Sequence, residues 1–488
     1  MHIDLNSCFA TVEQQANPHL RGKPVAVAAY DSPGGCILAA SYEAKKFGVN
    51  TGLRVREGRA LCPGLIVLSP EPNKYRFINR KLTALLSQYT AEMEVRSIDE
   101  MVLNFAHSVT LETKIKQISE IFKSNKKNCY IAKLLNCCLG VQFGLNKFSP
   151  ALVTVNNSTI QQFNNSQLKV ILSMFDIGLE IKNRIKSDIG DYLTVSIGIS
   201  TNRFLAKTAS GLRKPDGLDA IVNDNIEGIL ANMKVEDLCG IKGGYGARLR
   251  FHGIGSALSF YRASIRQLRG AFSSINGYYW WLRLHGWEAD DRDFGRKSFG
   301  HSHALYEPYA TGDRQLHQIL CQLVEKMGRR LRRRGYSAGG IHLACLFDTR
   351  ARPPELQSIW QTFGSGPSFW HKSEKLPFPV YAGSDLYREA LRVLAKSPDL
   401  PVRILSVACF YLIKRRNEQL HLYEDHGRQK ELVAATDRIN DRWGELTVFP
   451  AQLLTAKRRV IDRIAFGGVK ELEEISTSDF NSEKGVDK

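Results

Sequence analysis

The sequence predicts an α+β protein made of several domains. Its 488 residues correspond to roughly three domains of ordinary length. Short apolar runs bounded by turn residues alternate with segments of helical periodicity, a pattern typical of strands and helices that build one sheet. Hydrophobic residues make up 43% of the chain and charged residues 24%, so it can bury sizeable cores, and collagen-like or wholly disordered classes are excluded.

The first half of the chain supplies the elements of a mixed sheet. Apolar runs predict short strands at the N-terminus, in PVAVAAY, on both sides of the acidic pair in RSIDEMVLNF, and in YLTVSIGIS. Helical periodicity covers residues 72–90, begins again at residue 176, and returns in NRFLAKTASGL. After Leu218, short helices punctuated by glycine end in the aromatic residues 278–281.

The last part of the chain repeats this alternation. The charged stretch EADDRDFGRK, residues 288–297, predicts a linker. Strands and helices then alternate from 298 to 413. One clear helix follows over 430–443, and we expect the polar C-terminus to fray.

Residues 107–170 differ in composition from the rest of the chain. They contain eight Asn and eight Lys but no Arg, whereas the final third is rich in Arg. This shift predicts an inserted segment that is poorly ordered or loosely packed. The alternative is an ordinary surface loop with a helix over 111–123.

The chain is strongly basic. Its 67 Lys and Arg residues exceed 49 Asp and Glu residues, which leaves a net charge of +18. Such a charge favours a partner with a phosphate backbone, although ribosomal, membrane-surface and nuclease proteins share it.

The cysteine pattern and the lack of long apolar runs indicate a cytoplasmic protein. The ten cysteines show no CxxC and no Cys/His ligand spacing, so we expect reduced thiols and neither a zinc site nor a disulfide framework. No apolar run is long enough to predict a membrane-spanning helix, and the first residues lack the layout of a signal peptide.

Two acidic positions stand beside predicted strands. Asp4 lies near the end of the first strand, and Asp99 and Glu100 lie at a turn between two strands. Carboxylates that converge from neighbouring strands suit Mg²⁺, which takes oxygen ligands. A single strand-end Asp is more often solvated or a helix cap, so the surrounding motifs decide between the two interpretations.

Four motifs occur in a fixed order: HIDLNSCFATVE, LAASYEAKKFGV, RSIDEMVL and VSIGISTNRFLAKTASGLRKPDGL. Together they resemble the bacterial Y-family (DinB-like, translesion) DNA polymerases, and the resemblance extends to about residue 470 except over the inserted segment. It implies a right-hand polymerase with a ferredoxin-like palm and a helical helix-hairpin-helix thumb. The implied limits are 1–16 and 72–219 for the palm, 17–71 for the fingers, 220–290 for the thumb, 291–296 for a linker, 297–414 for an α+β little finger and 415–488 for a C-terminal tail.

The resemblance implies a catalytic metal centre. Asp4, Asp99 and Glu100 match the family's metal-binding carboxylates, the Leu5 carbonyl is a further ligand, and Asp99 and Glu100 are the catalytic pair. They would hold two Mg²⁺ ions about 4 Å apart. Phe9 falls at the family's steric gate, where an aromatic ring leaves no room for a 2′-hydroxyl.

The resemblance also implies contacts with the incoming deoxynucleoside triphosphate. Tyr42 and Lys45 are three residues apart on a predicted helix and share a face, and Lys207 joins them from the palm. The family often has Arg where Lys45 stands, and Lys offers a point charge in place of a bidentate fork.

Contacts with primer-template DNA are implied in two places. The segment LCGIKGGYGARLRFHGIGS resembles a helix-hairpin-helix, in which Ile241, Gly243, Gly244 and Tyr245 would hold a DNA phosphate through the backbone. RKSFGHSHAL opens a segment that resembles the little finger, with IHLACLF and VRILSVACFYL as inner strands and LPFPVYAGSDLYREALRVL as a turn and helix. Lys297 and Ser298 are its implied DNA contacts.

The arginine run KMGRRLRRRG is expected to extend the basic surface toward DNA; the alternative is a solvated helix face. The segment QLHLY matches a short form by which bacterial polymerases of this kind dock on the sliding clamp, with Gln419, Leu420, Leu422 and Tyr423 as the contacts. The alternative is a strand or connector fragment. We expect a monomer.

The function expected from the resemblance is template-directed, low-fidelity DNA synthesis across damage. Two alternatives remain open. One is a catalytically silent DNA-binding accessory protein of the same fold, which the short first strand and the inserted segment favour. The other is a helix-hairpin-helix nuclease, which does not explain the SYEAKKFGV and SIGIS motifs.

Overall fold

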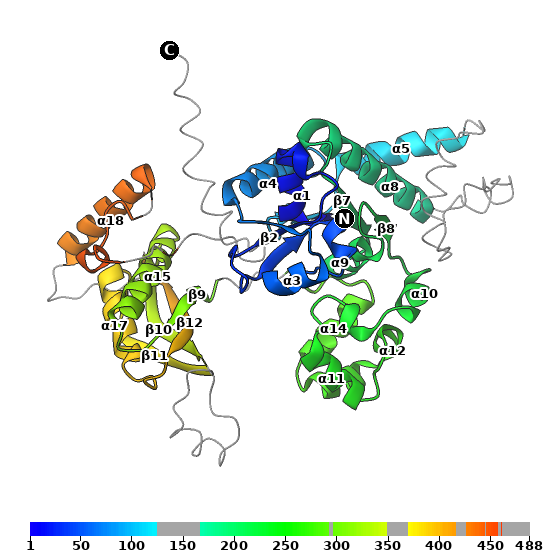
Figure 1. Cartoon of the computed structure of the whole chain (residues 1–488). Helices are drawn as coiled ribbons and strands as arrows, with labels where there is room; N and C mark the ends of the chain where they lie inside the picture. The colour runs from blue at the N-terminus through cyan, green and yellow to red at the C-terminus, as the bar shows by residue number, and fades with distance from the viewer. Residues whose placement is uncertain are drawn as a thin grey trace. The chain divides into compact units, whose positions relative to one another are not determined.

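The computed structural model describes residues 1–123, 166–291, 296–348, 369–415, 426–444, 446–456 and 460. It contains two compact units, one made mainly of Met1–Arg292 and the other mainly of Asp293–Asp462 (Figure 1). Both units combine helices with sheets, which confirms the predicted α+β class. Among the described helices, none is long and apolar enough to cross a membrane.

A five-stranded sheet forms the centre of the first unit. Its strand order is β5-β6-β1-β7-β8, in which β1 pairs antiparallel with both neighbours and β7 pairs parallel with β8. The strands are β1 (His2–Leu5), β5 (Met93–Val95), β6 (Glu100–Leu103), β7 (Val195–Ile199) and β8 (Leu218–Ala220). Because side chains alternate along a strand, Ile3 and Leu5 enter the core, whereas His2 and Asp4 face the other side.

Helices cover the sheet on both faces. The core face carries α1 (Cys8–Ala16), α4 (Pro72–Leu86) and α8 (Ser166–Arg184), with α8 ending in a π-helical turn, η2 (Ile185–Ile189). The other face carries α9 (Arg203–Leu212), which lies directly on β7. Gly198 makes this contact possible, since a Cβ there would lie 1.9 Å from a backbone oxygen of α9.

Part of the predicted insertion is packed against this sheet. Helix α5 (Val109–Lys123) lies along α8 (Figure 1). Its Ile118 is buried, and its Lys114 forms ion pairs with Asp176 and Glu180 of α8 at 2.9 and 3.0 Å. The expectation of loose packing is therefore wrong for 109–123, because the amphipathic periodicity of this stretch buries one side of a helix; residues 124–165 lie outside the described part of the chain.

A small three-stranded sheet extends the first unit over residues 17–71. Its order is β3-β2-β4, and its core is built largely from Ala and Val side chains. The elements are η1 (Pro18–Leu20), β2 (Val25–Ala28), β3 (Ile37–Ala40), α2 (Tyr42–Lys45), α3 (Val55–Leu61) and β4 (Ile66–Leu68). Ser41 begins α2 as its N-cap and accepts a hydrogen bond from the Ala44 N–H at 3.3 Å.

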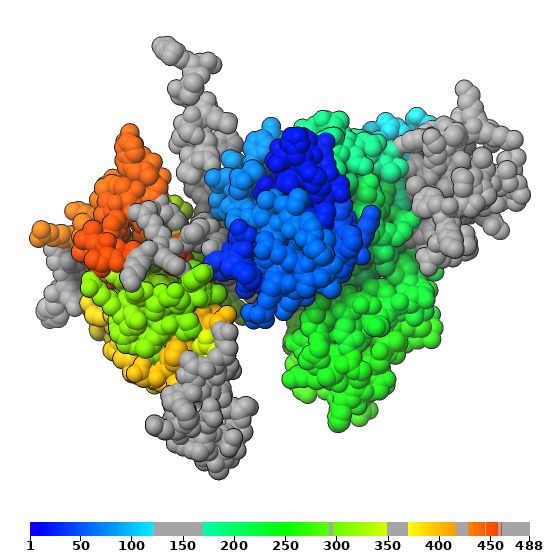
Figure 2. Space-filling model, in the orientation of Figure 1, coloured from blue at the N-terminus to red at the C-terminus, as the bar shows by residue number. Residues whose placement is uncertain are grey.

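Residues 220–290 form short helices around a separate aromatic core. Figure 2 shows this region as a green lobe below the blue surface of the N-terminal part. The elements are α10 (Ile226–Ala231), η3 (Val235–Asp237), α11 (Gly243–Phe251), α12 (Ala257–Arg262), α13 (Ile265–Phe272) and α14 (Asn276–Leu284). Within the aromatic run 278–281, Trp280 is buried, and its ring meets those of Phe204, Phe260 and Phe272 at 5.4, 5.6 and 6.1 Å.

The second unit is an antiparallel sheet with two helices packed on one face. Its strand order is β11-β10-β12-β9. The elements are β9 (Ser298–Tyr309), α15 (Arg314–Arg333), β10 (Tyr336–Phe347), β11 (Phe369–Val380), α17 (Gly383–Leu394) and β12 (Val402–Lys414). The segment expected to form a turn and a helix begins with the end of β11, where Val380 pairs with Ala338 of β10, and its expected helix is confirmed as α17.

Two C-terminal elements follow, α18 (His426–Trp443) and η6 (Ala451–Leu453). The arginine run at the end of α15 faces the first of them. Arg332 pairs with Asp437 at 2.7 Å, and Arg329 and Arg333 both pair with Asp441. Two acidic side chains of α18 thus pair with these three arginines and offset two of their three charges, so the expectation that they extend a DNA-facing surface is wrong for them.

Candidate active site

Three acidic side chains meet at the end of β1. Asp4 of β1 and Glu100 of β6 are direct partners in the antiparallel register, and Asp99 stands immediately before Glu100. The Leu5 N–H donates a hydrogen bond to the Asp99 carbonyl at 2.8 Å, which joins the two strands at this point. The structure thus brings together two pairs of residues that are more than 90 positions apart in the sequence, Asp4 with Leu5 and Asp99 with Glu100.

The carboxylates experience opposite electrostatic effects. Burial raises the pKa of Asp99, and the charges of Asp4 and Glu100 raise it further, against a hydrogen bond from Ser97. Burial alone would raise the pKa of Glu100, but the neighbouring His2 and the hydrogen-bonded ammonium of Lys207 lower it to about 2. The ionised form of Asp99 is therefore disfavoured by its surroundings, whereas that of Glu100 is favoured.

Two lysines occupy the space beside these carboxylates. Lys207 of α9 places its Nζ 2.6 Å from both carboxylate oxygens of Glu100. Lys214, in the turn after α9, places its Nζ 2.6 Å from Oδ1 of Asp4. Lys214 was not predicted from the sequence, although the turn KPDGL that contains it begins only seven residues beyond Lys207.

The donor set fits a magnesium centre. Within the described residues, no three His, Cys, Asp and Glu side chains form a group that could hold a metal ion as they stand. Glu100 and Asp4 are instead paired with Lys207 and Lys214. The carboxylates of Asp4, Asp99 and Glu100 and the Leu5 carbonyl nevertheless offer only oxygen atoms, which are the ligands that Mg²⁺ prefers. The raised pKa of Asp99 also indicates mutual repulsion that a divalent cation would relieve.

His2 also faces this site. Its Nε2 lies 3.8 Å from Oε2 of Glu100, and its Nδ1 lies 3.1 Å from the Ser210 hydroxyl. The imidazole is buried. His2 stands two residues before Asp4 on the same face of β1, and this period-two spacing is the signal by which the sequence could have revealed it.

Helix α2 places Tyr42 and Lys45, the two residues predicted to contact the triphosphate, near Asp4. Lys45 Nζ lies 4.5 Å from the centre of the Tyr42 ring and donates to the Ser7 hydroxyl at 2.7 Å. Burial lowers the pKa of Lys45, and the positive charge of Lys214 lowers it further. The two lysines thus form part of one positively charged cluster next to Asp4.

Phe9 lies in the first turn of α1, five residues after Asp4. The ring is 5% exposed and stacks on Tyr75 at 4.5 Å between ring centres. Tyr75 in turn donates a hydrogen bond to Glu13 at 2.8 Å. Phe9 therefore has a fixed orientation, as both a gate and an ordinary core residue would have.

The predicted hairpin lies at the start of α11. Ile241 is buried and anchors it, Gly243 and Gly244 are exposed, and Tyr245 packs on Phe272 at 5.1 Å. Lys242 precedes α11 without capping it through its side chain, so the exposed N-terminus of α11 suits a phosphate.

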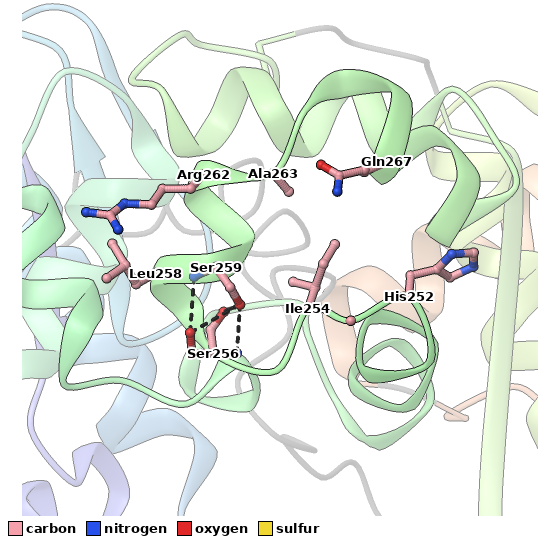
Figure 3. A pocket seen from close by; sticks show the side chains of 9 residues that line it. His252, Ile254, Ser256, Leu258, Ser259, Arg262, Ala263 and Gln267 are labelled. Atoms are coloured by element: carbon pink, nitrogen blue, oxygen red, sulfur yellow. Dashed lines mark hydrogen bonds between the residues drawn. The ribbon is translucent and has the colours of Figure 1, made fainter.

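Three other features lie outside this acidic site: two predicted DNA contacts, a cavity and the predicted clamp motif. Lys297 and Ser298 are exposed at the start of β9, in the second unit. A cavity of about 370 Å³ near α12 (Figure 3) is lined by Ser256 and Ser259, which hydrogen-bond each other at 3.1 Å, and by Arg262, which pairs with Glu227. The clamp-motif residues Gln419, Leu420, Leu422 and Tyr423 lie outside the described residues.

Comparisons with known proteins identify relatives that match most of the chain. The model of the impB/mucB/samB family matches residues 3–211, and the model of that family's C-terminal domain matches residues 296–422. "DNA polymerase IV" of Pelotomaculum thermopropionicum is 28% identical over 93% of this chain and 94% of its own. "DNA polymerase IV 2" of Bacillus subtilis is 25% identical over 95% of this chain and 96% of its own.

A solved structure has the same fold. A Y-family DNA polymerase chimera of Dbh and Dpo4 matches with a TM-score of 0.58 at 18% identity. The match covers 84% of this chain and 98% of the chimera.

Proposed function

We propose, from the premise that the chain belongs to the impB/mucB/samB family, the Y-family of DNA polymerases, that its three carboxylates form a catalytic centre. This centre would perform template-directed nucleotidyl transfer to a primer 3′-hydroxyl. The chain is a DNA-directed DNA polymerase of the bacterial DinB type that carries out translesion synthesis. The relatives named DNA polymerase IV give no support to the silent accessory alternative, and a nuclease would not match the family over residues 3–211.

The observation that carries the catalytic assignment is the pairing of Asp4 with Glu100 across β1 and β6, with Asp99 next to them. We assign these carboxylates and the Leu5 carbonyl as ligands for two Mg²⁺ ions. When bound, the ions would activate the attacking 3′-hydroxyl and stabilise charge on the leaving pyrophosphate. Asp99 and Glu100 carry the negative charge that this binding requires.

The lysines have a second role in this proposal. Lys207 and Lys214 compensate the carboxylates in the absence of cations. With cations bound, both ammonium groups would be free to contact the triphosphate of the incoming deoxynucleotide. Lys45 and Tyr42 approach the same region from α2. Positive charge placed where phosphate charge develops stabilises the transition state.

The remaining predictions become proposals about regions. The five-stranded sheet is the palm, residues 17–71 are the fingers, 220–290 the thumb, and the second unit contains the little finger. Phe9 excludes ribonucleotides, supported by its fixed stack on Tyr75. Primer-template DNA contacts the backbone at Gly243 and Gly244 and the start of the little finger at Lys297 and Ser298.

Three further proposals rest on sequence alone. The segment 419–423 docks on the sliding clamp, the protein acts as a monomer, and it acts in the cytoplasm.

Primer extension with Mg²⁺ tests the catalytic assignment. The Asp99→Ala/Glu100→Ala variant should lose extension and keep affinity for primer-template DNA, since contacts with the phosphate backbone carry most of that affinity. Glu120→Ala, an exposed acidic position on α5, is the matched control and should behave as wild type. Extension by the double variant at the wild-type rate would contradict the assignment.

A further inference from the structure

A hydrogen-bond network joins the back of α2 to the segment that precedes β7. Glu43 of α2 accepts a hydrogen bond from the Tyr192 hydroxyl at 3.1 Å through Oε1. Its Oε2 accepts from Nε2 of Gln14 at 3.2 Å. Gln14 is buried in α1, so the network connects three elements that are distant in sequence.

Tyr192 is itself held from several sides. Its N–H donates to Oε1 of Gln15 at 2.7 Å, and its hydroxyl accepts from the Gly22 N–H at 3.1 Å. Arg21 lies over its ring at 5.1 Å and pairs with Asp191 through two hydrogen bonds of 3.0 Å. The segment around Arg21 is thereby fixed to the palm at two neighbouring residues.

Glu43 takes part in this network as a carboxylate. Burial opposes its ionisation, but hydrogen bonds from Ser41, its own backbone, Gln14 and Tyr192 together lower its pKa. Hydrogen bonds to an ionised acceptor are stronger than neutral ones. The contact between Glu43 and Tyr192 is therefore well suited to hold a short element in place.

Helix α2 needs such support. It has only four residues, Tyr42–Lys45, and a single turn has no stability of its own. Its front presents Tyr42 and Lys45 beside Ser7, and its back is Glu43. Tyr192 stands three residues before β7, whose Ser196 is the register partner of Asp4. The network thus sets how far the α2 side chains stand from the carboxylates.

We propose that Glu43 and Tyr192 are positioning residues for nucleotide binding, which orient Tyr42 and Lys45 toward the triphosphate without touching it. This inference rests on the proposed function of Tyr42 and Lys45. It adds to that proposal the part of the palm that determines where the fingers hold the nucleotide. Gln14 and the Arg21–Asp191 pair support the same contact.

Single-nucleotide insertion kinetics on primer-template DNA test this inference. In Glu43→Ala we expect the KM for the deoxynucleotide to rise about tenfold with kcat within about twofold, since the lost interaction orients groups that bind the substrate. Tyr192→Phe should raise KM about fivefold. Glu43→Gln should stay within about threefold of wild type, because its amide oxygen still accepts from Tyr192.

The control is Glu57→Gln, which alters the Glu57 contact to the Arg54 N–H at the start of α3 in the same small sheet. It should leave both constants unchanged. The melting temperature and the Kd for DNA are measured for every variant. The inference would be overturned if KM were unchanged in Tyr192→Phe and Glu43→Ala. It would also be overturned if KM rose while kcat and the melting temperature fell to a similar degree, and Glu43→Gln did not restore them.

Failure of the proposed function would look different. In that case the wild-type protein would not extend primers, or Lys45→Ala would extend them with the wild-type KM. A raised KM in Lys45→Ala together with normal KM in the Glu43 and Tyr192 variants would reject only the positioning role.

Discussion

Replacement of Lys214 by Met should change metal binding and nucleotide binding in opposite directions. In the protein without nucleotide, the Lys214 ammonium pairs with Asp4 at 2.6 Å, and a metal ion must displace it to use that oxygen. Lys214→Met removes this competitor and leaves the carboxylates to repel each other. It also removes a positive charge that, under the proposed function, contacts the triphosphate.

The magnitude follows from the exposure of the pair. The Lys214 side chain is 35% exposed and that of Asp4 13%, so solvent screens part of their attraction. Such a partly exposed pair contributes about 1 kcal/mol, which corresponds to a gain of about fivefold in metal affinity when the pair no longer has to be broken. Loss of a charged contact with phosphate should raise the KM for deoxynucleotides about tenfold.

Two assays separate these effects. Mn²⁺ titration followed by electron paramagnetic resonance measures metal affinity without nucleotide, and steady-state insertion measures KM. Lys186→Met is the matched control, because Lys186 pairs with Asp216 at 3.0 Å and has a similar exposure, 40%. Weaker or unchanged Mn²⁺ affinity in Lys214→Met would refute the view that its ammonium competes with the metal.

Three other predictions concern the gate, the sheet and the inserted segment. Phe9→Ala should admit ribonucleotides in insertion assays, and an unchanged preference for deoxynucleotides would place the gate elsewhere. Gly198→Ala should lower the free energy of unfolding in urea by about 3 kcal/mol or more, since its Cβ would collide with the backbone of α9. Gly211→Ala, where a Cβ meets nothing within 4 Å, should not lower it. Equal stability of both variants would contradict the close packing of α9 on β7. Deletion of residues 108–168 should lower the free energy of unfolding by at least about 2 kcal/mol, because it removes the buried Ile118; a deletion variant as stable as wild type would show that α5 adds nothing to the palm.

Local pattern was sufficient for most elements. The alternation in HIDL and VSIGI and the periodicity of 72–90 correspond to β1, β7 and α4. These elements were predictable because one face of each is apolar and the other is not, and that difference is written at a fixed period in the sequence. The spacing of Tyr42 and Lys45 similarly predicted a shared helix face, and the structure places the Lys45 ammonium over the Tyr42 ring.

Long-range partners could not be read from the same patterns. The arginine run of α15 has the composition of a DNA-binding surface, and only the position of Asp437 and Asp441 on α18 shows that three of its members form ion pairs within the protein. The segment LPFPV at the end of β11 is a second example, because proline is disfavoured within strands. It is tolerated in β11 because this strand lies at the edge of the sheet, where fewer backbone N–H groups need partners.

The site shows why motif residues and positioning residues differ in how well a sequence reveals them. Under the proposed function, Asp4, Asp99 and Glu100 do chemistry that calls for carboxylates, so their residue types alone point to a role. The contact between Tyr192 and Glu43 is one hydrogen bond, in which the hydroxyl and Oε1 lie 3.1 Å apart. It forms only because the fold brings together two segments that are nearly 150 residues apart in the sequence. Many other residue pairs could supply such a bond at another position. Chemical necessity therefore marks the catalytic centre in the sequence, whereas geometry alone marks the residues that orient it.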